Sequence, residues 1–198
     1  MIEDLNTYLH QVAQTVTQLP RQPLDRIAEA IWETYERDGT ILICGNGGSA
    51  ASASHFACDM AKLTISADSR RVRALALTDN IPLITAWSND QAYADVFVEQ
   101  LIGLYRPGDM LFAISGSGNS PNVLRAVEWA NDRGAPTVGL TGFDGGRLAR
   151  LARFSLHVRN DIMPQVEDIH MTICHGLAVA MRRRIADMAL LANAFGSL

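Results

Sequence analysis

The chain has 198 residues, of which 48% are hydrophobic and 19% charged, a composition typical of a folded globular protein rather than a disordered one. This length predicts one domain over residues 1–198 with room for a substantial core. The formal net charge of −4 provides no overall attraction for nucleic acid or for an anionic membrane. No apolar stretch approaches the roughly 18 residues of a membrane span, and the acid- and amide-bearing N-terminus does not resemble a signal peptide. We therefore expect a cytoplasmic protein that binds neither nucleic acid nor membrane.

The three cysteines, Cys44, Cys58 and Cys174, share no spacing typical of a metal or redox site. They fit small buried residues in a reducing compartment.

Two amphipathic helices are predicted before the first strand. Apolar residues recur every three or four positions within residues 2–18, and again from Pro23 to about Glu36, where Asp38-Gly39 ends the pattern. Two helices alone cannot easily form a domain. We expect the segment 1–38 either to pack on the rest of the chain or to lie between subunits of an oligomer.

After residue 39 the pattern alternates between strands and helices. Short continuous apolar runs are typical of strands buried on both faces, and they occur at 40–44, 72–77, 110–114, 137–140 and 154–158. Helical patterns lie between or after them at 50–63, 81–87, 93–104, 122–132 and 147–151, and a long final helix covers about 165–194. This order predicts an α/β fold with a doubly wound, mainly parallel five-stranded sheet flanked by helices.

A glycine-rich loop follows the first predicted strand and opens a helix. The loop, Gly45-Asn46-Gly47-Gly48-Ser49, brings free backbone N–H groups to a helix N-terminus, an arrangement that suits an anion such as phosphate. It lacks the lysine of a Walker loop and the usual spacing of a dinucleotide fingerprint. Ser49 is also a natural helix N-cap, so a purely structural turn is the alternative.

A second loop strengthens the prediction of a phosphate site. The strand at 110–114 runs into Ser115-Gly116-Ser117-Gly118-Asn119-Ser120-Pro121, which carries more hydroxyl groups than a turn requires. A third strand end carries Thr141-Gly142-Phe143-Asp144-Gly145-Gly146. Ligands of open α/β sheets bind beyond the carboxyl ends of the strands. We therefore expect these loops to hold the phosphate of a sugar through Asn46, Gly47, Gly48, Ser49, Ser115, Ser117 and Ser120.

Titratable residues gather on two of the predicted helices. His55 and Asp59 are four residues apart and share a helix face, which suits a metal site, an acid–base couple or an ordinary surface pair. The final helix carries Glu167, Asp168, His170 and His175, and spacing alone does not choose among them.

The motifs together resemble a known family. GNGGSA and ISGSGNSPNV, each after a strand, are similar to the signature of sugar isomerase (SIS) domains. GNGGSAASASHFA, TAWSND, GDMLFAISGSGNSPNV, GLTGFDGG and VEDIHMTICH resemble, in order, the phosphoheptose isomerases (sedoheptulose-7-phosphate isomerases). The resemblance covers nearly the whole chain, including the N-terminal helices.

The resemblance implies a zinc site formed by His55, Asp59, Glu167 and His175 beside the sugar. The family's usual set is His, Glu, Gln, His, so this chain has a shorter acid at Asp59 and an additional carboxylate at Glu167. We expect Asp59 or Glu167 to be the catalytic base and His175 an acid or ligand. Gly116 stands where these enzymes often have Thr. Asp90 matches an acidic position that contacts substrate hydroxyls, although a helix N-cap explains it equally well.

The implied reaction converts sedoheptulose 7-phosphate to D-glycero-D-manno-heptose 7-phosphate for activated heptose synthesis, in a homotetramer with sites at its interfaces. Three rival hypotheses remain. One is a non-catalytic SIS scaffold that binds the bacterial replication initiator, the second is a phosphosugar sensor, and the third is an isomerase of another phosphosugar. The departures at Asp59, Gly116 and Glu167 keep the third hypothesis open.

Overall fold

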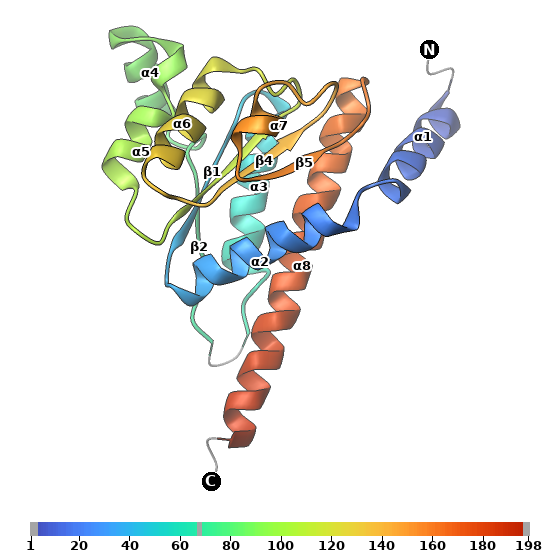
Figure 1. The fold of residues 1–198 in the computed structure, drawn as a ribbon, viewed down its shortest axis with the longest axis vertical. Coiled ribbons are helices and arrows are strands. Elements are labelled where there is room, and N and C mark those ends of the chain that lie inside the picture. Colours follow the sequence, from blue (N-terminus) through green and yellow to red (C-terminus); the bar gives the residue numbers. More distant parts are fainter. Residues whose placement is uncertain (1–3, 67–68, 196–198) are drawn as a thin grey trace.

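The computed structural model describes residues 4–66 and 69–195 and has a parallel five-stranded sheet at its centre (Figure 1). The strand order is β2-β1-β3-β4-β5, and all neighbouring strands are parallel. The predicted fold class is therefore confirmed. The strands are β1 (Thr40–Gly45), β2 (Arg73–Ala76), β3 (Met110–Ser115), β4 (Thr137–Thr141) and β5 (Phe154–His157).

Helices cover both faces of this sheet. The described helices are α1 (Leu5–Thr17), α2 (Arg21–Glu36), α3 (Gly48–Lys62), α4 (Ile81–Asp90), the short 3-10 helix η1 (Tyr93–Asp95), α5 (Val98–Leu104), α6 (Pro121–Asp132), α7 (Leu148–Leu151) and α8 (Met163–Phe195). Alternate residues of β1 face opposite layers. Ile41 and Ile43 pack with α2, α3 and α8, whereas Leu42 and Cys44 pack with α4, α5, α6 and α7.

The order of the strands places the functional loops at one edge of the sheet. The chain moves from β1 outward to β2 and then returns to the other side of β1 to form β3, so the strand order reverses between β1 and β3. Gly45 pairs with Ile114, and Ser115 pairs with Thr141. The loops after β1, β3 and β4 therefore leave the sheet side by side at the switch point, where ligands of such sheets bind.

Three expectations about individual segments were wrong. The run at 72–77 was expected to be buried on both faces, but β2 is an edge strand that exposes Arg73 and Leu75. The predicted helix at 93–104 is divided into η1 and α5. Cys58 is exposed, whereas Cys44 and Cys174 are buried as expected.

The N-terminal helix α1 contacts the start of α8 through polar side chains, and its Val12 and Val16 pack against the core. It has no buried residue, and it projects from the body of the molecule (Figure 1). Tyr8 donates a hydrogen bond of 2.5 Å to Asp168, and Gln165 donates one of 2.7 Å to Gln11. Burial, together with the charge of Asp168, raises the pKa of Tyr8 to about 12. The prediction for residues 2–18 is confirmed for the part from Leu5 onward, because residues 2 and 3 lie outside the described residues.

The long helix α8 passes the sheet and continues beyond it (Figure 1). Arg184 connects its second half to α2 through two hydrogen bonds to Glu29, of 2.6 and 3.1 Å, and its guanidinium lies 4.1 Å from the ring centre of Trp32. Although α8 has 33 residues, no helix among the described residues is both long enough and apolar enough to cross a membrane.

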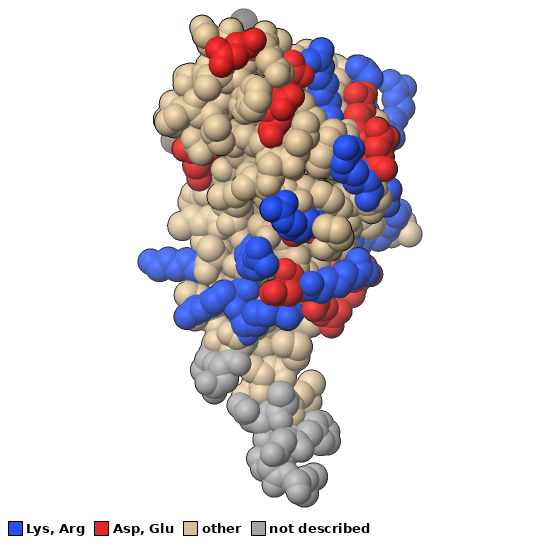
Figure 2. Space-filling view, turned by 90° about the vertical axis from the view of Figure 1, so that its left-hand side faces the viewer, with Lys and Arg blue, Asp and Glu red and all other residues tan. Residues whose placement is uncertain are grey.

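Charged side chains of both signs share the face that carries α4 and α5. Figure 2 shows Lys and Arg across the middle of this face and along its upper right-hand edge, with Asp and Glu beside many of them. Asp38, for example, lies within 3.8 Å of both Arg70 and Arg73. Basic and acidic side chains are therefore interspersed on the described part of this face.

Candidate functional site

The first loop presents backbone N–H groups at the start of α3. Gly47 has a positive φ of 57° and is the cap residue, and α3 begins at Gly48 without a side-chain cap. Ser49 is the second residue of the helix and is buried, so its interpretation as an N-cap was wrong. The N–H groups of Ala50 and Ala51 bond to the carbonyl of Gly47. Those of Gly48 and Ser49 have no intrahelical partner and can bind an anion.

The second loop places two of its serine hydroxyls together. The Oγ atoms of Ser115, at the end of β3, and Ser120, which precedes α6, are 3.3 Å apart. Ser117 is exposed at the tip of the loop, where its Oγ accepts a hydrogen bond of 3.3 Å from the N–H of Asn119. The structure therefore brings the predicted serines to the same strand end as the glycine loop.

Gly116 has a structural explanation. A Cβ atom at this position would lie 2.7 Å from the sulfur of Met163, the first residue of α8. The Thr that the resemblance leads us to expect would therefore collide with Met163 unless that side chain moved. Met163 therefore occupies the space in which a Thr side chain at position 116 would lie.

The third loop supports the second one through its backbone. The N–H of Gly142 donates to the carbonyl of Gly116 over 2.8 Å, and that of Leu148 donates to the carbonyl of Gly118 over 2.9 Å. A Cβ on Gly118 would lie 2.2 Å from the carbonyl oxygen of Gly145. The glycines of these two loops are therefore required by the close approach of their backbones.

A pair of asparagines joins the first loop to α6. Asn46 and Asn122 exchange two hydrogen bonds, of 2.8 and 2.9 Å, and Tyr93 donates to Asn46 over 2.8 Å. Asn122 is only 1% exposed. Sequence reasoning missed Asn122 and Tyr93, although Asn122 directly follows the Ser-Pro that opens α6.

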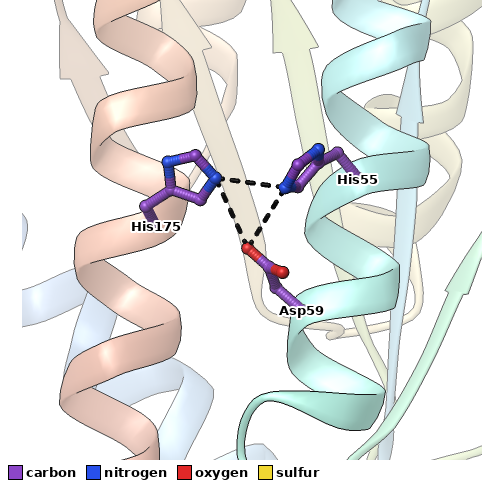
Figure 3. Close-up of side chains that lie close together, drawn as sticks. All are labelled: His55, Asp59 and His175. Atoms are coloured by element: carbon purple, nitrogen blue, oxygen red, sulfur yellow. Dashed lines mark hydrogen bonds and ion pairs between the residues drawn. The ribbon is translucent and has the colours of Figure 1, made fainter.

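Three side chains converge between α3 and α8, which lie side by side (Figure 3). The Nε2 atoms of His55 and His175 are 3.1 Å apart, and each lies 3.6 Å from Oδ2 of Asp59. Asp59 exposes 19% of its side chain, whereas the two histidines expose about half of theirs. The tertiary structure therefore brings His175 next to His55 and Asp59, although His175 lies 120 residues after His55 in the chain.

The three atoms suit a zinc ion. Zinc bonds of about 2.0–2.1 Å at tetrahedral angles place two ligand nitrogens about 3.3 Å apart, close to the 3.1 Å found between His55 and His175. Two imidazoles and one carboxylate are a donor set typical of catalytic zinc, which keeps a fourth position open. These three residues, all of them predicted ligands, are the group that the structure brings together.

The structure does not bring Glu167 into this group. Its carboxylate lies against the first loop instead, because a Cβ built on Gly48 would be only 2.3 Å from Glu167 Oε1. The half-buried Glu167 therefore lies against the first loop, at the start of α3. Any side chain larger than hydrogen at position 48 would displace it.

Asp90 is not a helix N-cap. It is the last residue of α4, it is exposed, and it accepts a hydrogen bond of 2.8 Å from the side chain of its neighbour Asn89. Tyr93, three residues later, contacts Asn46, so this segment lies at the rim of the first loop.

His170, also on α8, faces the core and not the group of His55, Asp59 and His175. It is fully buried, and neither ring nitrogen has a hydrogen-bond partner among the residues that the structure describes. Burial lowers the pKa of His170 to about 4, so its imidazole is neutral at pH 7.

Fold and site together define an α/β protein with hydroxyl- and glycine-rich loops at the switch point of a parallel sheet. The sequence model of the SIS domain matches residues 7–142, and the chain belongs to this family. It is 40% identical over 155 residues to a phosphoheptose isomerase of Helicobacter pylori, a match that covers 78% of this chain and 80% of the relative.

Two further relatives match more of the chain. A phosphoheptose isomerase of Roseiflexus is 36% identical over 188 residues and 94% of both chains. The structure of the phosphoheptose isomerase from Neisseria gonorrhoeae superposes with a TM-score of 0.80 at 34% identity and covers 86% of this chain and 91% of its own. The chain is therefore a phosphoheptose isomerase-like member of the SIS family.

Proposed function

We propose that this protein is an aldose–ketose isomerase that converts sedoheptulose 7-phosphate to D-glycero-D-manno-heptose 7-phosphate, a step toward activated heptoses. The observation that carries the proposal is the group of His55, Asp59 and His175. His55 and Asp59 lie on α3, the helix that begins at the glycine loop, and His175 lies beside them on α8. A phosphate at that loop leaves the rest of the sugar free to extend toward the three side chains. The named relatives support the same reaction class.

Each part of the site has a proposed role. Asn46, Gly47, Gly48 and Ser49 of the first loop bind the phosphate together with Ser115, Ser117 and Ser120 of the second. Asp90, at the rim, contacts sugar hydroxyls. His55, Asp59 and His175 hold zinc, and Glu167 is the fourth candidate ligand. Bound zinc would stabilise negative charge that develops on two neighbouring oxygens of the sugar.

The isomerisation also requires a group that moves a proton between adjacent carbons. Asp59 and Glu167 are the two candidate bases. A carboxylate committed to a metal is a poor base, and Asp59 lies 3.6 Å from both histidine nitrogens. Glu167 lies outside that group and beside the loop proposed to hold the substrate phosphate. We therefore assign the base to Glu167 and place His175 as a ligand that can also act as an acid.

Turnover that depends on zinc is the direct test. Metal-free protein is expected to be inactive on sedoheptulose 7-phosphate, and activity should return when one equivalent of zinc is added per chain. The formation of the aldose phosphate would be followed by chromatography. Binding of the sugar phosphate without turnover would contradict this substrate and favour a sensor. Absence of both binding and turnover would favour the scaffold that binds the replication initiator.

An isomerase of another phosphosugar is the second candidate, and two observations favour it. Asp59 is one methylene shorter than the family's usual Glu, and Met163 fills the space where a Thr hydroxyl is expected at position 116. Both differences change the volume near the substrate. A panel of ketose phosphates of five to eight carbons, compared by kcat/KM, distinguishes the two candidates.

We also propose a homotetramer that uses the N-terminal helices and α8. Leu5 and Leu9 of α1 are 71% and 55% exposed, and Leu190 and Leu191 of α8 are 68% and 59% exposed. A second copy of the chain would remove this apolar surface from water. Light scattering is expected to give four times the chain mass of 21.6 kDa. Leu5→Glu with Leu9→Glu should lower that mass, and a monomeric wild-type protein would contradict the proposal.

A further inference from the structure

Neighbouring hydrogen bonds determine which atom is the oxygen and which the nitrogen in the side-chain amides of Asn46 and Asn122. A side-chain amide can be placed in two ways, which differ in the exchange of its oxygen and nitrogen, and neighbouring groups decide between them. The N–H of Val123 lies 2.9 Å from Asn122 Oδ1. A backbone N–H only donates, so this atom of Asn122 has to be the oxygen.

The orientation of Asn122 then determines that of Asn46. Because Asn122 Oδ1 accepts, the atom of Asn46 that lies 2.8 Å from it has to be the nitrogen Nδ2. The oxygen of Asn46 consequently faces Asn122 Nδ2, at 2.9 Å, and the hydroxyl of Tyr93, at 2.8 Å. Tyr93 must therefore donate to Asn46, and not accept from it.

The three hydrogen bonds of the Asn46 side chain show which of its donors and acceptors remain free for a ligand. Its oxygen accepts two hydrogen bonds, which is its usual capacity, and one of its two amide hydrogens is bonded to Asn122. The second hydrogen has no partner among the residues that the structure describes. Asn46, half-buried beside the glycines of the first loop, thus offers a ligand one donor and no acceptor.

We propose that Asn122 and Tyr93 are positioning residues that orient Asn46, so that its free N–H donates to an acceptor oxygen of the ligand's phosphoryl group. The inference rests on the proposed function only in taking phosphate as the group bound by the loop. The two residues come from different elements, η1 and α6. Their contacts also hold the glycine loop and the serine loop at a constant separation, because α6 begins directly after the serine loop.

Tyr93→Phe is the decisive variant. Tyr93 is 54% exposed, so loss of its hydroxyl removes one hydrogen bond and little packing. The hydrogen bond to Asn46 Oδ1 is lost, and the dissociation constant for inorganic phosphate is expected to rise about 2- to 10-fold. The midpoint of thermal unfolding should not change. Tyr105→Phe is the matched control, since Tyr105 packs against Trp129 near the C-terminal end of α6 and has no hydrogen bond to Asn46 among the described residues.

The orientation itself is measured by NMR. The Asn46 side-chain amide signal, identified by its loss in Asn46→Asp, is expected to shift on titration with inorganic phosphate and to shift in Tyr93→Phe without phosphate. Asn122→Asp should have a larger effect than Tyr93→Phe, because the new carboxylate oxygen faces the oxygen of Asn46. Asn131→Asp, at the opposite end of α6, controls for the loss of a structural asparagine.

The outcomes separate this inference from the proposed function. An unchanged phosphate affinity in Tyr93→Phe, or an equal loss in Tyr105→Phe, overturns the inference whatever the enzyme's substrate. Tyr93-dependent phosphate binding without turnover of sedoheptulose 7-phosphate supports the inference and overturns the proposed substrate. A wild-type protein that does not bind phosphate overturns both.

Discussion

Replacing His175 with alanine is expected to abolish stoichiometric zinc binding and sugar-phosphate turnover together. The Nε2 atom of His175 lies 3.1 Å from that of His55 and 3.6 Å from Oδ2 of Asp59, so its loss leaves two ligands on one helix. Loss of an outer-shell partner of a metal ligand lowers affinity or activity about 10- to 100-fold. Loss of a ligand itself should lower kcat/KM by more than about 100-fold.

The folded state should survive this change, because the side chain of His175 is 49% exposed. Zinc content is measured after dialysis, and turnover is measured in the same samples. His55→Ala should behave in the same way as His175→Ala. His10→Ala, an exposed histidine on α1, is the matched control and should retain both zinc and activity. A His175→Ala variant that keeps one zinc per chain would contradict the assignment of the metal group.

Glu167→Gln is expected to lower kcat about 10²- to 10⁴-fold, the usual contribution of a general base. The substitution keeps the size of the side chain and removes its ability to accept a proton. Because Glu167 lies outside the group of His55, Asp59 and His175, zinc content should change little. The amide should still fit against Gly48, where the carboxylate now lies.

The control for Glu167→Gln is a substitution of the next residue in the same turn of α8. Asp168→Asn removes the neighbouring carboxylate and keeps an oxygen that can accept the hydrogen bond from Tyr8. It should retain near-normal turnover, and a loss equal to that of Glu167→Gln would point to a general effect of charge near the site. Near-normal turnover of Glu167→Gln would instead move the base to Asp59. Loss of zinc from Glu167→Gln would restore Glu167 as a metal ligand.

Local patterns in the sequence predicted most of the fold. Strands such as β3 are continuous apolar runs, and the amphipathic helices have a period that differs clearly from theirs. Local patterns failed where the neighbours of a segment decide its environment. The run that forms β2 was expected to be buried on both faces, yet it lies at the edge of the sheet, where Arg73 and Leu75 meet solvent.

The candidate site could be predicted in part. The glycine and serine loops are visible because strand ends and turn residues are local features. The hydrogen bonds between Asn46, Asn122 and Tyr93 were missed, because each of these residues has an ordinary local explanation. These hydrogen bonds form only when the first loop, η1 and α6 pack together. The family resemblance supplied His55, Asp59, Glu167 and His175 as candidate ligands, and the structure brings three of them together. The role of Glu167 as a ligand stays a prediction.

The sequence by itself determined the parallel α/β fold, the loops that offer N–H and hydroxyl groups, and the helix face shared by His55 and Asp59. These properties depend on residues close together in the chain, whose backbone geometry obeys periodicity and turn chemistry. Only the tertiary structure decided that His175 lies beside His55 and Asp59, that Glu167 lies against Gly48, and that Met163 occupies the space beside Gly116. Each of these contacts joins distant segments through the way α8 packs against α3 and the loops, and that packing has no local signature.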